Sequence, residues 1–127
     1  MDKTILVVRD LAIGKQIMEA LDRAKLGISV ALWAYLAEYQ DWRLVLASKR
    51  FDEIGLREAF GLVNQALDAA GIPNRDQPSI VILKMTDKTI KDLRKTYAKF
   101  KNMEGDHIGN QLHGDRFIEE AIVYRIK

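Results

Sequence analysis

The 127-residue sequence predicts a single α+β domain in which three helices cover one sheet of about five strands. Three observations predict this class, and a mixed α/β arrangement is the alternative. Apolar residues recur at helical spacing in three segments, and short β-rich runs lie between those segments. The composition, 48% apolar and 30% charged, is ordinary for a globular protein. No linker or repeat divides residues 1–127, so the predicted order is helix, hairpin, helix, strand, helix, hairpin.

The predicted helices are marked by apolar residues spaced three or four positions apart. They cover residues 10–25, 52–70 and 87–101. Asp10 and Asp52 are candidate N-caps, and Gly27 and Gly71 follow the first two helices as C-cap residues. The buried stripe of the second helix is predicted to consist of Leu56, Phe60, Val63, Leu67 and Ala70.

The predicted strands form two hairpins and one single strand. They cover residues 28–36, 42–48, 79–85, 106–112 and 116–126. The single strand, SIVILKM, is apolar throughout, as expected of a strand covered on both faces. The last hairpin is predicted to turn at His113-Gly114, which places His107 opposite Glu120. Residues 4–8 fit a short strand and a lead-in to the first helix equally well.

Two stretches of the chain are similar to sequences of a known group. ALWAYLAEYQDWRLVLAS, followed by an acidic helix start, and the ending HGDRFIEEAIVYRI resemble a group of short uncharacterised prokaryotic proteins. The resemblance spans most of the chain, and its motifs are core strands and turns. It implies the same element order and a cytoplasmic, prokaryotic origin. That group carries no assigned activity, so no catalytic residue is transferred.

The composition excludes several chemistries. The absence of cysteine removes disulfides, thiolate metal sites and cysteine nucleophiles, and it suits a reducing compartment. No glycine-rich phosphate loop, HExxH helix or GxSxG elbow occurs. The longest stretch without a charge, residues 26–37, is shorter than the ~18–20 residues that span a bilayer, and no signal peptide is evident. We therefore expect a soluble cytoplasmic protein with no metal, no cofactor and no membrane contact, more consistent with a binding domain than with an enzyme.

The most distinctive feature is a strip of lysines on the third helix. Four lysines fall within about 80° of one another on the helix circumference, opposite the apolar stripe, when each residue advances by about 100°. This lysine ridge consists of Lys88, Lys91, Lys95 and Lys99. Residues 84–101 carry seven basic and two acidic side chains, a net charge of +5 against −3 for the rest of the chain. Such a strip is usually a solvated face; its functional interpretation is contact with a polyanion, nucleic acid above all. Tyr97 and Phe100 are placed on the inner face, so base stacking on this helix is not expected.

An aromatic group gathers around the first hairpin. Its members are Trp33, Tyr35, Tyr39 and Trp42. Such a group is either helix-covered core or an exposed patch that contacts a protein partner. Both hairpins also offer open strand edges, at which a second copy of the chain could pair, so a homodimer is a further hypothesis.

A carboxylate interrupts the apolar face of the last strand. Glu120 is expected to share that face with Ile118, Ile122, Tyr124 and Ile126. His107 across the ladder and Arg43 from the first hairpin are its candidate partners. The functional interpretation is a His/carboxylate pair that acts as a general base or binds a metal. The structural alternative is a Glu120 near the sheet rim, solvated or paired with a basic side chain.

Three functions therefore compete, in this order. The first is a non-enzymatic interaction domain that acts through protein partners or self-association. The second is binding of a polyanion or nucleic-acid backbone through the lysine ridge. The third is a small metal-dependent or acid/base hydrolase centred on Glu120 and His107, which requires these side chains to line one pocket.

Overall fold

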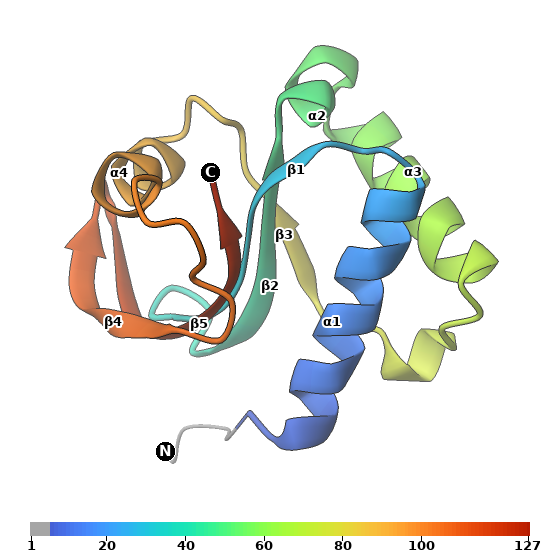
Figure 1. Cartoon of the computed structure of the whole chain (residues 1–127), viewed down its shortest axis with the longest axis horizontal. Helices are drawn as coiled ribbons and strands as arrows, with labels where there is room; N and C mark the ends of the chain where they lie inside the picture. The colour runs from blue at the N-terminus through green and yellow to red at the C-terminus, as the bar shows by residue number, and fades with distance from the viewer. Residues whose placement is uncertain (1–5) are drawn as a thin grey trace.

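The computed structural model describes residues 6–127, which form a five-stranded mixed sheet with helices on both faces (Figure 1). The helices of this part of the chain are α1 (Val8–Arg23), α2 (Lys49–Ile54), α3 (Leu56–Ala69) and α4 (Lys88–Tyr97), with a 3₁₀ turn at Asn74–Asp76. The strands are β1 (Ile28–Leu36), β2 (Asp41–Ser48), β3 (Ile80–Ile82), β4 (His107–His113) and β5 (Arg116–Ile126). The predicted α+β class is confirmed. None of the described helices is long and apolar enough to cross a membrane.

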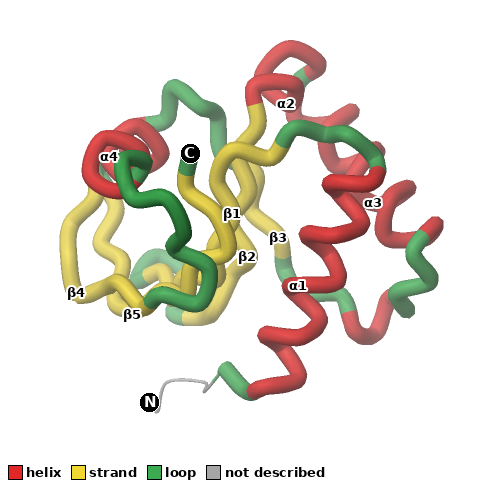
Figure 2. Tube along the Cα trace, viewed as in Figure 1, coloured by secondary structure: helices red, strands yellow, loops and turns green. Residues whose placement is uncertain are grey.

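The sheet has the strand order β3-β2-β1-β5-β4, with β2 and β3 parallel and the other neighbours antiparallel. Its centre, β1, is apolar on both faces because both faces are covered. Ala31, Trp33 and Tyr35 pack beneath α1 and α3. Val30 and Leu32, with the alternate residues that follow them along β1, point to the other face and belong to a second core that α4 covers. Figure 2 shows α4 on one side of the sheet and α1 and α3 on the other.

Strand β5 changes face twice, which the sequence pattern did not predict. Its register with β1 shifts between Tyr35 and Leu36 and again between Ala31 and Leu32. Ile118 and Ile126 therefore join the core under α4, whereas Ile122 and Tyr124 pack on the α1 side. The prediction that these four residues share one face with Glu120 is wrong. An irregularity that adds one residue to a strand reverses its alternation, and period-two counting does not detect it.

The predicted second helix is two helices. Gly55 has a φ of +88° and ends α2 before α3 begins, so residues on either side do not share one stripe. Leu56 is consequently 57% exposed instead of buried. The residues that α3 buries are Ala59, Val63, Ala66 and Leu67. Phe60 is half-buried and Ala70 is exposed.

Two helix starts also differ from the prediction. Ser48 caps α2, since its Oγ accepts a hydrogen bond from the Arg50 amide at 3.1 Å. The Asp52 carboxylate instead accepts from the Met85 amide at 3.0 Å, which ties the end of the β3 region to α2. Helix α1 begins at Val8, and Asp10 lies in its first turn rather than at the cap.

Two boundaries also differ from the prediction, and the sequence leaves residues 4–8 open. The single strand is reduced to Ile80–Ile82, half-buried at a sheet edge because only β2 pairs with it. At the end of α1 the left-handed residue directly after the C-cap is Lys25, with Gly27 two residues later, whereas Gly71 follows α3 as predicted. Of residues 4–8, Thr4 and Ile5 lie outside the described residues, and the two that follow are not in a strand.

Tyr124 connects β5 to α1. Its hydroxyl donates to the Leu11 carbonyl at 2.7 Å and accepts from Trp33 Nε1 at 3.0 Å. A Cβ at Gly14 would collide with this hydroxyl, so glycine there permits the close approach. Burial raises the pKa of Tyr124 to about 12.

We predict that Tyr124→Phe lowers the free energy of unfolding by about 1–2 kcal/mol at neutral pH, because a buried indole N–H loses its acceptor. The folded-state pKa lies above the unfolded value of 10, so the neutral phenol contributes stability below about pH 10 that is lost toward pH 12. Denaturant unfolding across that window should therefore show a shallower alkaline loss for the variant. Equal alkaline slopes for both proteins would contradict this account.

Candidate functional site

The lysine ridge lies on the side of α4 that faces away from the sheet. Lys88, Lys91 and Lys95 are exposed on the helix, and Lys99 is exposed two residues after its end. The opposite side of α4 is buried, with Ile90 and Leu93 almost fully inaccessible. Figure 1 shows α4 at the outer flank of the molecule. The predicted exposure of the ridge is therefore confirmed.

No ion pair among residues 6–127 involves a ridge lysine. The reason lies in the two acids of residues 84–101, both of which contact the β4–β5 hairpin. Asp87 Oδ1 accepts from the Thr89 amide at 2.9 Å and from Arg116 Nη1 at 2.7 Å. Asp92 Oδ2 lies 2.7 Å from His113 Nδ1. The acids of α4 are thus engaged by the hairpin, and the lysines keep their charge uncompensated.

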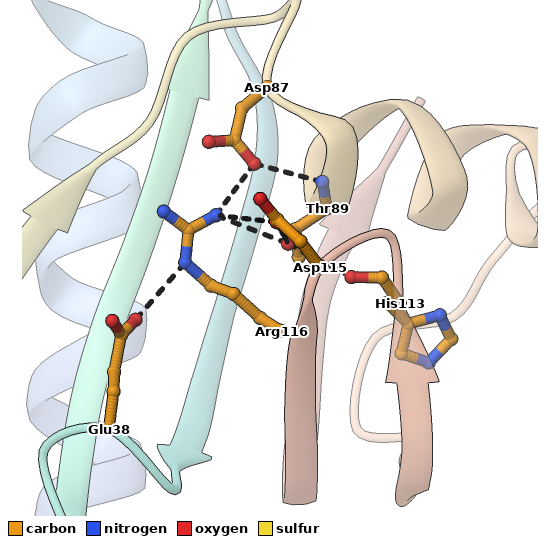
Figure 3. Close-up of polar contacts among 6 residues, drawn as sticks. All are labelled: Glu38, Asp87, Thr89, His113, Asp115 and Arg116. Carbon is orange, nitrogen blue, oxygen red and sulfur yellow. Dashed lines mark hydrogen bonds and ion pairs between the residues drawn. The ribbon is translucent and has the colours of Figure 1, made fainter.

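The turn of the β4–β5 hairpin packs directly on the first turn of α4. Gly114 has a φ of +62°, and a Cβ there would lie 2.5 Å from the Lys88 carbonyl carbon, so only glycine fits this approach. Thr89 Oγ1 donates to the His113 carbonyl at 3.0 Å. These contacts fix the start of α4 against the sheet (Figure 3).

Arg116 is the centre of the charged contacts in Figure 3. Besides Asp87, its guanidinium donates to Thr89 Oγ1 at 3.1 Å and to Glu38 Oε1 at 3.1 Å, which links α4 to the β1–β2 turn. Burial acts to lower the pKa of Arg116, but its hydrogen bonds to Asp87 and Glu38 outweigh burial and raise that pKa. Asp115, 3.9 Å away, is mostly exposed and contributes little.

His113 is a buried residue whose role the sequence did not reveal. It is 2% exposed, its ring tilts against Tyr97 at 6.0 Å between centroids, and Nε2 is buried with no hydrogen-bond partner among the described residues. We predicted the turn at His113-Gly114, whereas it occupies Gly114-Asp115, because His113 pairs with Arg116. Glycine is typical of the first central position of one kind of two-residue hairpin turn. The dipeptide Gly114-Asp115 was therefore the sequence signal for the correct turn position.

The turn position shifts the hairpin register by two residues. His107 consequently lies opposite Ile122, and Glu120 lies opposite Gly109. His107 and Glu120 are exposed diagonal neighbours on the sheet face that α1 covers further along, not a directly opposed pair.

Arg43 lies on the other face of the sheet, since the alternate residues that follow it along β2 belong to the core under α4. Its guanidinium is 4.5 Å from the centre of the Tyr39 ring. Residues 6–127 contain no group of three His, Asp or Glu side chains suited to a metal. The three candidate catalytic residues are not brought together.

The aromatic group is core and not an exposed patch. Trp33, Tyr35 and Trp42 are at most 8% exposed, because α1 and α3 cover their face of the sheet. Tyr35 and Trp42 meet edge-to-face at 5.7 Å. Tyr39, 44% exposed, is the member of the group that a partner could contact.

Helix α4, which corresponds to the predicted third helix, is shorter than predicted and ends at Tyr97. One aromatic residue therefore lies outside the helix. Phe100 lies in the following turn, 52% exposed, instead of on the inner face. Lys99 Nζ lies 5.5 Å from the centre of its ring.

Comparison of the chain with protein-family models, with curated proteins and with solved structures finds no match. The fold and surface define an α+β domain with a cationic helix face.

We predict that Arg116→Ala lowers the free energy of unfolding by about 1–3 kcal/mol, because Asp87 and Thr89 lose a charged, partly buried partner. The control is Arg9→Ala, which removes the 2.6 Å pair with Asp76 from a side chain that is 71% exposed, and which should cost less than about 1 kcal/mol. Urea unfolding of both variants measures the difference. Equal losses would show that Arg116 does not hold the hairpin to α4.

Proposed function

We propose that this protein is a small non-enzymatic binding domain that contacts a polyanion, first of all the phosphate backbone of nucleic acid, through the lysine ridge. The observation that carries the proposal is the separation of charge across α4. Asp87 and Asp92 are engaged by the hairpin, and four exposed lysines have no carboxylate partner among the described residues.

Lys95 lies in the last turn of α4, where a cation interacts favourably with the helix dipole, but the neighbouring lysines of the ridge repel one another. Like charges at i and i+4 on a helix cost a few tenths of a kcal/mol, as at Lys91 and Lys95. They become favourable when phosphates approach, since a lysine ammonium is a mobile point charge. At about 1.5 Å per residue the helical part of the ridge, from Lys88 to Lys95, extends for roughly 10 Å, about three phosphate intervals along one strand of B-form DNA.

Two features favour nucleic acid over other partners. The apolar side of α4, including Ile90 and Leu93, is buried in the core, so the helix has no apolar face to insert into a bilayer. The burial of Trp33 and Trp42 reduces the aromatic surface available to a protein partner and leaves Tyr39 as the exposed member of the aromatic group. The cytoplasmic origin expected from the resemblance is compatible with a nucleic-acid partner.

We predict that the protein is retained on heparin and binds duplex DNA with strong salt dependence. Each phosphate neutralised contributes about −0.9 to the slope of log affinity against log salt, so four lysine contacts give about −3.6. The double variant Lys91→Glu/Lys95→Glu leaves two lysine contacts, so the slope should become no steeper than about −1.8. Binding at low salt should weaken by at least about tenfold.

The matched control is Lys49→Glu with Arg57→Glu. Both residues are exposed on α2 and α3, beyond the sheet from α4, and the change in net charge is identical. The control should keep most of the affinity and the slope. If the two double variants weaken binding equally, or if neither does, the ridge is not the binding site.

A further inference from the structure

A cavity of about 520 Å³ lies beside the start of α4. One wall is formed by the α2–α3 junction, including Phe51 and Leu56. The other is formed by the end of β3 and the loop that follows, including Ile82, Lys84 and Thr86. Pockets of roughly 300–1,000 Å³ are typical of small-ligand sites.

The topology of the sheet explains why a crevice forms there. Strands β2 and β3 are the parallel pair, and the cavity lies at their carboxyl ends. After β2 the chain continues into α2 and α3, which pack on the face of Trp33; after β3 it continues into α4, which packs on the opposite face. Neighbouring parallel strands whose connections leave to opposite faces open a crevice between them, and this is the usual ligand position in such sheets.

The lining is divided by polarity. Phe51, Leu56 and Ile82 provide the apolar part of the lining, and Leu56, the first residue of α3, is 57% exposed. Asp52 and Asp87 also line the crevice; Asp52 accepts a hydrogen bond from the Met85 amide, and Asp87 accepts from the Thr89 amide and from Arg116.

One cationic residue lines the crevice, and a second directly follows a lining residue in the chain. Lys84 is an exposed member of the lining, and the first ridge lysine, Lys88, directly follows Asp87. A ligand that fits this pattern has an apolar body bearing hydrogen-bond donors and an anionic group outside it.

We propose that the crevice takes the base of one nucleotide unit, with its phosphate on Lys84 and Lys88. This inference rests on the proposed function, because the phosphates of the same strand would continue onto the lysine ridge. The carboxylate of Asp52 repels a phosphate from the interior and accepts hydrogen bonds from amino groups of a base, whereas the carboxylate of Asp87 is ion-paired with Arg116. A paired base cannot enter such a site, so the preferred ligand is an unpaired strand or a free nucleotide.

The test compares an unpaired oligonucleotide, its duplex, inorganic polyphosphate and a mononucleotide. Leu56→Asp should weaken the unpaired oligonucleotide by about tenfold and abolish mononucleotide-induced NMR shifts around Ile82 and Thr86. It should leave duplex and polyphosphate binding within about twofold. Leu112→Asp is the control, since Leu112 is a leucine of similar exposure, 65%, on the β4–β5 hairpin. The milder variant Leu56→Ala and circular dichroism of every variant test whether a loss of binding comes from a loss of folding.

Loss of duplex and single-strand binding alike in Leu56→Asp, or mononucleotide shifts outside the crevice, would overturn the crevice proposal while leaving the ridge intact. Binding of the mononucleotide with no preference over inorganic phosphate would also overturn it, because the base would then contribute nothing. If the ridge variant Lys91→Glu/Lys95→Glu keeps full polyphosphate affinity, the proposed function fails instead, and the mononucleotide shifts still decide the crevice. Preference for an unpaired strand and for a mononucleotide, both lost in Leu56→Asp, would support the proposal.

Discussion

The contact on which the rest of this structure depends is the docking of the β4–β5 turn on the first turn of α4. Gly114 lies against the Lys88 backbone, Arg116 connects Asp87 to the β1–β2 turn, and Asp92 meets His113. These contacts hold the helix over one face of the sheet. They also engage both acids of the helix region, so the same interactions that position α4 leave the lysine ridge without internal counter-charges.

The ridge and the crevice both result from the connections that follow β2 and β3. The chain leaves β2 toward one face and β3 toward the other, which places α4 alone on its side of the sheet. Its outer surface is therefore open along its length, and the loop that precedes it, up to its N-cap Asp87, forms one wall of the crevice. Lys84 and Lys88 connect the two features, so a ligand with repeating phosphates could contact both at once.

The sequence predicted whatever depends on local spacing. The α+β class, the first hairpin and the exposure of Lys91 and Lys95 follow from helix and strand periods, which act over a few residues. It did not predict features set by single residues or distant contacts. Gly55 divides a helix, two irregularities reverse β5, and placing the turn one residue too early hid the buried His113 and its contact with Asp92. The carboxylate at Glu120 drew attention because strict alternation was assumed along β5.

The most direct test of the claim that α4 presents uncompensated charge is an NMR titration of the protein with inorganic polyphosphate at low salt. The account predicts that the largest shifts occur at the backbone and side-chain signals of Lys88, Lys91, Lys95 and Lys99, and that added salt reverses them. Exposed lysines elsewhere, such as Lys25 and Lys49, should move little. Shifts spread evenly over all exposed lysines, or none on α4, would contradict the account.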